Sequence, residues 1–155
     1  MTAVRVSLVD VYPVRVWHGS LQLLLLRRAP GGRCPGSHEA VHGHIEAGEP
    51  PAEAARRELR EETGLSPLRL YNLSRVELFY QAAPDEVALV PVFVAVIADG
   101  ADVVRSVEHD ASEWVDFSEA RRRLTWPRSA RALDDIERLL PGGEAGPVTD
   151  VLLLS

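Results

Sequence analysis

The spacing of apolar residues changes along the chain, and its first third is typical of strands. Valine-rich residues 4–17 and leucine-rich residues 21–28 flank a short polar segment at 18–20, which predicts two strands joined by a tight turn. The first strand is expected to break at Tyr12-Pro13. Glycine and proline fill residues 29–37, which predicts an exposed loop before extended structure resumes at 39–42.

The clearest helix is expected at residues 51–63. Pro51 suits the first turn of a helix, and Gly64 suits the position just after its end. Helical spacing returns at residues 118–124 and 128–140, where apolar side chains recur on one face. These two later helices are expected to pack on the sheet.

Two more strands are expected in the second half of the chain. Residues 68–78 are typical of a strand, and residues 87–97 are continuously apolar, as in a strand buried on both faces. Pro91 indicates a bulge or a sheet edge. The tail at 141–154 is expected to form a loosely held strand or to pack between molecules. With no internal repeat and no linker, residues 1–155 are expected to form a single α/β domain.

Composition excludes several classes of function. The formal net charge is −6, and the 17 basic residues are dispersed, which argues against binding a nucleic-acid polymer. All 17 are arginine, so lysine Schiff-base chemistry and a lysine phosphate clamp are excluded. A small anionic substrate remains open, provided that a metal ion or placed arginines offset the field of the protein.

The cellular setting is predicted from what the chain lacks. Cys34 is the only cysteine, so no internal disulfide is expected. The first residues do not have the pattern of a secretory signal, and the apolar runs are too short to span a bilayer. We therefore expect a cytoplasmic protein without membrane contact, either a monomer or a homodimer.

Three glutamates share one face of the expected helix. At about 100° per residue, Glu58, Glu61 and Glu62 fall within an arc of about 100°. Arg56 and Arg60 point away from them, and no side chain of this face is expected to neutralise the charge. The neighbouring arc is small or apolar and is expected to bury against the sheet: Ala52, Ala55, Leu59 and Thr63.

Clustered carboxylates are typical ligands of a hard divalent cation. Like charges at these spacings cost a helix a few tenths of a kcal/mol per pair, roughly, unless a cation lies between them. Mg²⁺ prefers oxygen ligands and bridges carboxylates to substrate phosphates, and a bound metal also acidifies its water. Three glutamates alone also fit a solvated acidic face.

The surrounding residues decide between these readings, because residues 43–65 match the Nudix box at every one of its nine defined positions. The chain therefore resembles the Nudix hydrolases, and the resemblance implies an α/β/α sandwich with a mixed sheet. The matching positions are Gly43, Glu49, Arg57, Glu58, Leu59, Glu61, Glu62, Gly64 and Leu65.

The resemblance also implies roles for these residues. In Nudix enzymes the glutamates matching Glu58, Glu61 and Glu62 bind Mg²⁺ or Mn²⁺ or activate water. The arginine matching Arg57 orients a box glutamate, here Glu49. The carbonyl before the box glycine is often a metal ligand, which points to the backbone carbonyl of His42. The imidazole of His42 is expected to form a wall of the cleft.

A weaker resemblance extends to the branch with dihydroneopterin triphosphate and dATP pyrophosphohydrolase-like proteins. It rests on residues 37–46, 108–115 and 124–131, and it makes Glu108 a candidate remote metal ligand. Glu108 also fits an ordinary loop acid. His38 departs from the pattern, since relatives often have tryptophan there.

The substrate side of the site has three further candidates. Arg27 and Arg28 end an apolar strand and are candidates to meet phosphates, although arginines at strand ends are usually solvated. Trp126 is a candidate to stack on a base or a pterin, or else it packs between helix and sheet.

The expected reaction is metal-dependent hydrolysis of a phosphoanhydride bond in a small molecule. With a dATP-like or dihydroneopterin triphosphate-like substrate, it releases pyrophosphate and a monophosphate. The alternatives are a diphosphatase acting on ADP-ribose or a nucleotide sugar, and a Nudix-fold ligand-binding module without catalysis. A binding module would ordinarily lack a box carboxylate, and here all are present.

Overall fold

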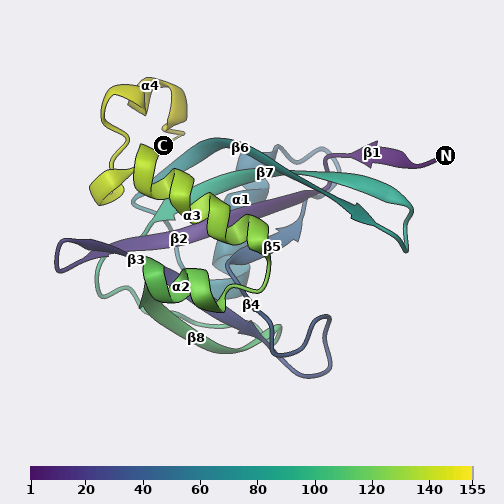
Figure 1. Ribbon diagram of the computed structural model, residues 1–155, viewed down its shortest axis with the longest axis horizontal. Coiled ribbons are helices and arrows are strands. Elements are labelled where there is room, and N and C mark those ends of the chain that lie inside the picture. The colour runs from purple at the N-terminus through teal and green to yellow at the C-terminus, as the bar shows by residue number, and fades with distance from the viewer. Residues whose placement is uncertain (155) are drawn as a thin grey trace.

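The computed structural model describes residues 1–154 of the chain, whose strands join in one sheet of eight strands. Four α-helices accompany the sheet in this described part: α1 Pro51–Thr63, α2 Phe117–Arg123, α3 Pro127–Leu139 and α4 Thr149–Leu152 (Figure 1). The strands are β1 Ala3–Arg5, β2 Leu8–Trp17, β3 Ser20–Arg28, β4 His38–Glu39, β5 Val41–His44, β6 Arg69–Gln81, β7 Glu86–Val96 and β8 His109–Asp116.

The sheet is mixed, as expected. Strand β7 pairs in parallel with β1 and β2 and antiparallel with β6. Strand β2 also pairs antiparallel with β3 and β5, while β3 pairs antiparallel with β4 and β8. Strands β2, β3 and β7 are therefore central, and β4, β5 and β8 gather near one another around β2 and β3.

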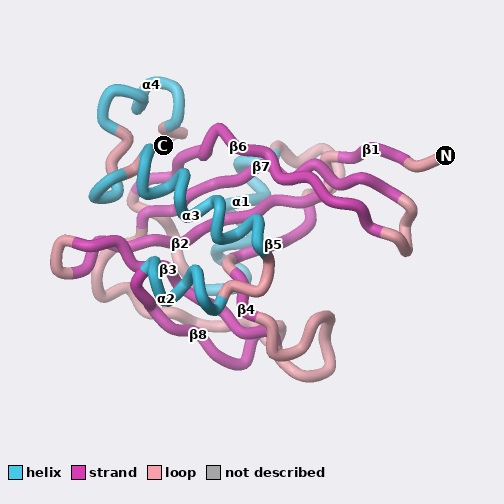
Figure 2. The backbone as a smooth tube through the Cα atoms, viewed as in Figure 1, coloured by secondary structure: helices cyan, strands magenta, loops and turns pink. Residues whose placement is uncertain are grey.

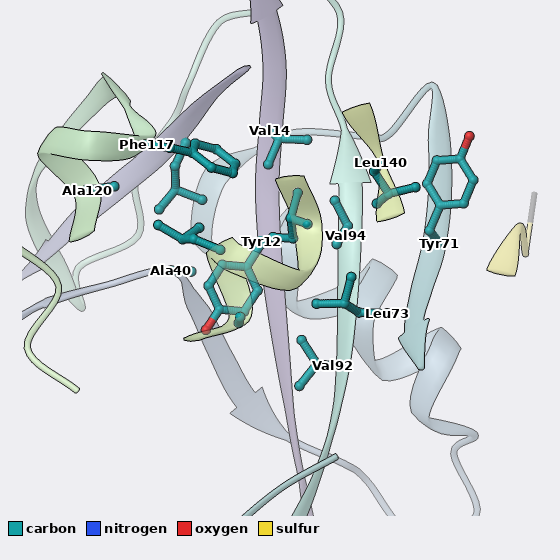
Figure 3. Packing of buried hydrophobic residues seen from close by; sticks show 14 of the residues in the cluster. Tyr12, Val14, Ala40, Tyr71, Leu73, Val92, Val94, Phe117, Ala120 and Leu140 are labelled. Atoms are coloured by element: carbon teal, nitrogen blue, oxygen red, sulfur yellow. The ribbon is translucent and has the colours of Figure 1, made fainter. Parts of the chain in front are cut away.

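Helices cover both faces of the sheet, which confirms the expected α/β/α sandwich. On one face, Ala55 and Leu59 of α1 pack with Val9, Val11 and Leu24. On the other face, α2 and α3 pack on a second core, seen in Figure 3 around Tyr12 and Val94. Alternate residues of β2 thus belong to different cores, as the two-residue period of a strand requires.

The expected break at Tyr12-Pro13 was wrong, because β2 runs through both residues. Pro13 pairs in register with Ala95 of β7 on one side. On its other side, the pairing with β5 ends at Val11 and the pairing with β3 begins at Val14. Proline has no N–H to donate, and this gap between two ladders is a place where a donor is not needed.

Strand β7 differs from the expected strand that is buried on both faces. From Val92 to Val96 every residue is buried, but Val87, Leu89 and Pro91 remain partly exposed. The predicted irregularity lies in the partner strand beside Pro91, where the register of β6 shifts between Asn72 and Val76. The first half of β7 therefore has one face that the rest of the chain leaves partly uncovered.

The loops and the tail complete the fold. Residues 29–37 form a loop, as expected, and Figure 2 shows it projecting from the sheet beside β4. The tail is mostly helical and is not the loosely held strand that was one of its two expected forms; 3₁₀ turns at Pro141–Gly143 and Gly146–Val148 precede α4. Only Leu153 bridges to Tyr71 of β6 among the described tail residues. The helices of residues 1–154 are all too short or too polar to cross a membrane.

Candidate active site

Helix α1 has the ends that its sequence predicts. It runs over Pro51–Thr63 with proline in its first turn, and Gly64 follows with φ 72°, donating its backbone N–H to the carbonyl of Arg60. This left-handed conformation favours glycine, because a Cβ would be strained there. The two ends fix the turn on which Glu58, Glu61 and Glu62 lie.

Gly43 of β5 allows the helix to approach the sheet beneath Glu58. A Cβ placed on Gly43 would lie 2.1 Å from Cδ of Glu58, a distance that no side chain tolerates. The first glycine of the box is therefore needed for space and not for backbone conformation. It lets the Glu58 carboxylate lie directly over the β5 backbone.

Arg57 neutralises three of the nearby glutamates, so the expectation of an unneutralised helix face was wrong. Its guanidinium donates to both carboxylate oxygens of Glu49, each at 2.9 Å, and to the backbone carbonyl of His44 at 2.7 Å. It also donates to Glu58 at 2.9 Å and to Glu61 at 3.1 Å. We call these four side chains the Arg57 cluster: Glu49, Arg57, Glu58 and Glu61.

The charges of the Arg57 cluster stabilise one another. Hydrogen bonds from Arg57, together with one from the backbone N–H of Glu46, lower the pKa of Glu49 to about 2. The same Glu49 bond is the largest cause that raises the pKa of Arg57 above its usual range. Both groups are therefore charged at neutral pH, and the loop at 45–50 is fixed to α1.

The Glu62 carboxylate, unlike that of Glu49, is buried without a hydrogen-bond donor in the described chain. Its side chain is 3% exposed, and within residues 1–154 neither carboxylate oxygen has a hydrogen-bond partner. Burial, together with the charges of Glu108, Glu58 and Glu39, raises the pKa of Glu62 to about 10. A buried carboxylate without donors is costly unless a proton or a cation binds it.

Two more buried polar groups lie beside Glu62. His109 of β8 holds its Nε2 2.8 Å from Oε1 of Glu39 in β4, and its Nδ1 lies 3.8 Å from Oε1 of Glu62. That Nδ1 is also without a hydrogen-bond partner in the described chain. We call Glu39, Glu62 and His109 the Glu62 cluster, and one ligand atom from each lies within 4.8 Å of the others.

Glu39 is the charged member of this cluster. Burial raises its pKa, but hydrogen bonds from His109 and Arg28 outweigh that effect and hold the pKa below its ordinary value. Arg28 lies 2.9 Å from the Glu39 carboxylate. The pairing of β3 brings these groups together, because Leu26 faces Glu39 on one side and Arg28 faces His109 on the other.

The Glu62 cluster and nearby Glu58 fit a divalent cation. Carboxylate oxygens with one imidazole are a donor set that Mg²⁺ or Mn²⁺ accepts, and the partnerless oxygens of Glu62 are free to serve. A cation there would offset the repulsion that Glu39, Glu58 and Glu108 impose on Glu62.

The remaining metal-ligand candidates lie around this cluster. Glu61 is 58% exposed and is held by Arg57. Glu108 is exposed, but it is near enough for its charge to raise the pKa of Glu62. The imidazole of His42 bonds to Asp10 at 2.5 Å, on the face away from α1, and borders a small pocket with Tyr12 and Ser129.

The substrate-side candidates have partners of their own. Arg27 lies 2.7 Å from Asp110, and Arg28 is engaged by Glu39. Trp126 precedes α3 and is 41% exposed, so it does not pack between helix and sheet. The guanidinium of Arg128 lies 5.2 Å from the centre of the Trp126 ring.

The sequence alone did not single out Glu39 and His109. Both lie inside the segments that carry the weaker resemblance, residues 37–46 and 108–115. The available signals were an acid directly before the apolar Ala40 and Val41, and a histidine directly after the acid chosen as remote ligand. Neither signal says which strands bring the two residues together.

Comparison with known proteins adds the family. The profile described as NUDIX domain matches residues 5–136. The structure resembles an Ap4A hydrolase binary complex of C. elegans with a TM-score of 0.75 and 23% identity, covering 89% of this chain and 99% of that one. It also resembles the NUDIX domain of Shewanella oneidensis NrtR complexed with ADP ribose, with a TM-score of 0.70 and 16% identity over 90% of this chain and 89% of that one.

A curated relative is similar in sequence over part of its length. An octanoyltransferase of Myxococcus xanthus is 40% identical over 104 residues, which are 66% of this chain and 29% of that protein. The match thus covers under a third of that relative, which is a much longer protein. Since the family profile covers most of the sequence and the fold agrees with it, the chain belongs to the NUDIX domain family.

Proposed function

We propose that this enzyme uses Mg²⁺ or Mn²⁺ to hydrolyse a phosphoanhydride bond in a nucleoside triphosphate or a related triphosphate, such as dATP or dihydroneopterin triphosphate. The products are pyrophosphate and a monophosphate. The observation that carries the proposal is the buried Glu62 carboxylate without a hydrogen-bond partner, next to Glu39, Glu58 and His109. This group of side chains suits a bound cation better than a structural ion pair, because Glu62 has no donor of its own.

The metal-binding residues in this proposal are Glu58, Glu61 and Glu62, with Glu108 and the backbone carbonyl of His42 as further ligands. A bound cation supplies neutralisation of the phosphoryl oxygens and a more acidic water. Arg57 and Glu49 act as positioning residues, because their bonds fix the entry loop and one oxygen of Glu58. Glu39 joins the ligand set or holds His109 in place.

The chemistry balances as a hydrolysis. The oxygen of a water forms a new P–O bond, and the anhydride P–O bond to the leaving pyrophosphate breaks. The proton lost by the water goes to a carboxylate of the site and then to solvent. No redox partner or covalent intermediate is needed.

Substrate contacts are proposed at the edge of the site. Trp126 offers an exposed aromatic face on which a base or a pterin stacks, and Arg128 packs against the same ring. Arg27 and Arg28 are the proposed phosphate contacts. Arg28 has a Glu39 partner already, so it reaches a phosphate only if that pair opens.

A diphosphatase is the second candidate. The NrtR domain complexed with ADP ribose shares the fold, so an ADP-ribose or nucleotide-sugar substrate is kept as the alternative. A binding module without catalysis is the third candidate, and it is disfavoured because every carboxylate of the box is present.

The deciding experiment measures phosphate and pyrophosphate release with Mg²⁺ from a panel. The panel holds nucleoside triphosphates, dihydroneopterin triphosphate, ADP-ribose and nucleotide sugars. The variants are Glu61→Gln and Glu62→Gln, and Glu53→Gln is the matched control because it changes an exposed glutamate of the same helix.

Each outcome selects one candidate. Pyrophosphate release that collapses in Glu62→Gln and survives in Glu53→Gln supports the triphosphate proposal. Turnover confined to ADP-ribose or nucleotide sugars overturns the proposed triphosphate substrate in favour of the diphosphatase, and leaves the proposed metal site standing. Binding of a panel member without any turnover overturns the catalytic proposal in favour of the binding module.

A further inference from the structure

Three strands extend beyond the helices at one end of the sheet. Figure 1 shows β1 and the β6–β7 hairpin reaching past the helices toward the N-terminus. The register places Val4 beside Val87 and Tyr80, and then Leu78 beside Leu89. Residues paired directly across strands share a face of the sheet. We call this surface, together with Val6 just after the end of β1, the hairpin face: Val4, Val6, Val76, Leu78, Tyr80, Val87, Leu89 and Pro91.

The hairpin face is apolar and largely uncovered. Leu78 is 68% exposed, Val4 65%, Tyr80 59%, Val76 57% and Val6 52%. The opposite face of the same strands is closed, because Ala88 and Val90 pack against Leu8 and Phe79 there. Among the described residues, the chain therefore covers one face of this extension and leaves the other open.

The charge pattern of the hairpin face is also unusual for this protein. None of its eight residues is charged, although 26% of the chain is charged and the net charge is −6. Contiguous apolar patches of this kind are rare on soluble monomers and mark interaction sites. A charge-free surface is the one on which two copies of an acidic protein meet with the least repulsion.

We propose that the hairpin face is the interface of a homodimer, in which a second copy of this chain packs its own hairpin face on the first. Five of its side chains are more than half exposed, and a contiguous apolar patch of roughly 300–600 Å² on a protein surface is often functional. Two patches of that size bury roughly 600–1,200 Å² together, a range that reaches the 1,000 Å² or so that a specific interface needs.

The geometry of this dimer follows from sheet packing. Two sheets pack face to face at a separation of about 10 Å, with their apolar side chains interleaved. A twofold axis places the same patch on both copies, so a self-complementary surface without charges satisfies the symmetry. The prediction is independent of the proposed hydrolysis, because no residue of either cluster belongs to this face.

The test measures the mass of the full chain in solution by sedimentation velocity over a range of concentrations. The expected mass is twice the 17.0 kDa of one chain at micromolar concentration. Leu78→Arg and, separately, Val76→Arg should raise the dissociation constant at least 100-fold and give the monomer mass. Both side chains are exposed, so folding should persist, and circular dichroism checks it.

Val151→Arg is the matched control. Val151 is 67% exposed, close to the 68% of Leu78, but it lies on α4. This variant should remain a dimer with an unchanged dissociation constant. A monomeric wild-type protein overturns the proposal. So does a dimer that survives both arginine substitutions on the hairpin face, because its interface then lies elsewhere.

Discussion

The Arg57 cluster and the Glu62 cluster meet at helix α1, which contributes residues to both, and they balance their charges in opposite ways. In the first, every carboxylate accepts a hydrogen bond from Arg57, and the pKa of Glu49 is lowered to about 2. In the second, the Glu62 carboxylate has no donor, and burial raises its pKa to about 10. Glu61 and Glu62 are neighbours in sequence, yet they belong to different clusters.

The difference separates carboxylates that the protein already pairs from one that it leaves without a partner. Carboxylates that are hydrogen-bonded within the protein hold the local geometry. A buried carboxylate without a donor requires a proton or a cation. Arg57 holds the loop and Glu58 in place. Glu62 is left for a cation. The four predictions below test this division, beginning with the largest expected effect.

Glu62→Gln should lower hydrolysis more than about 100-fold, because the buried ligand loses its charge. The same change should raise the free energy of unfolding of metal-free protein by about 2 kcal/mol at neutral pH, since burying Glu62 requires it to take up a proton whereas an amide is already neutral. Steady-state rates and urea denaturation in EDTA measure the two effects. Loss of both activity and stability would contradict the division between clusters.

Arg57→Ala should destabilise the protein by about 2–3 kcal/mol, because it leaves Glu49, Glu58 and Glu61 without their shared donor. The rate should fall about 10–100-fold through misplacement of Glu58. Arg57→Lys should restore only part of either effect, because an ammonium cannot engage both oxygens of Glu49 as the guanidinium does. Full restoration by lysine would show that charge alone suffices.

Gly43→Ala should lower the rate about 10-fold while the fold persists. The new methyl would lie 2.1 Å from Cδ of Glu58, so that flexible side chain must move away from the site. Gly32→Ala serves as the control, because its Cβ would meet no atom nearer than 3.7 Å. Equal rates in the two variants would mean that the position of Glu58 is unimportant.

The pH dependence of metal-free protein should show the smallest effect. The folded pKa of Glu62 is raised from 4.5 to about 10, so the native state holds the extra proton between these values. Its contribution to stability is complete below pH 4.5 and declines as pH rises toward 10. We expect a decline of at most about 1.4 kcal/mol per pH unit, measured by urea denaturation in EDTA. Glu62→Gln should lack this decline of the unfolding free energy with pH. If its slope equals that of the wild type, the decline comes from other groups.

Local signals in the sequence were sufficient to place α1 and its carboxylates. Proline and Gly64 determine where the helix begins and ends, so Pro51–Thr63 agrees with the expectation at both ends. The turn at 18–20 and the helices α2 and α3 were also foreseen to within about one residue. Each of these features depends on neighbouring residues alone.

Features that depend on the pairing of strands far apart in the sequence could not be predicted from local signals. Strand β8 has no clean alternation of buried and exposed residues, and it was not predicted. Consequently the meeting of Glu39 with His109 was not foreseen, since it follows from the registers of β4 and β8 against β3. The different surroundings of Glu61 and Glu62 likewise follow from how closely α1 packs on the sheet.

The Glu62 cluster has a consequence for folding. Its two strand residues, Glu39 and His109, are 70 positions apart in sequence, with Glu62 between them. These residues are far apart in an unfolded chain. A cation that needs all three therefore binds only the native state and stabilises it by mass action. Melting temperatures recorded with different divalent ions should therefore rank the ions by affinity, without any knowledge of the substrate.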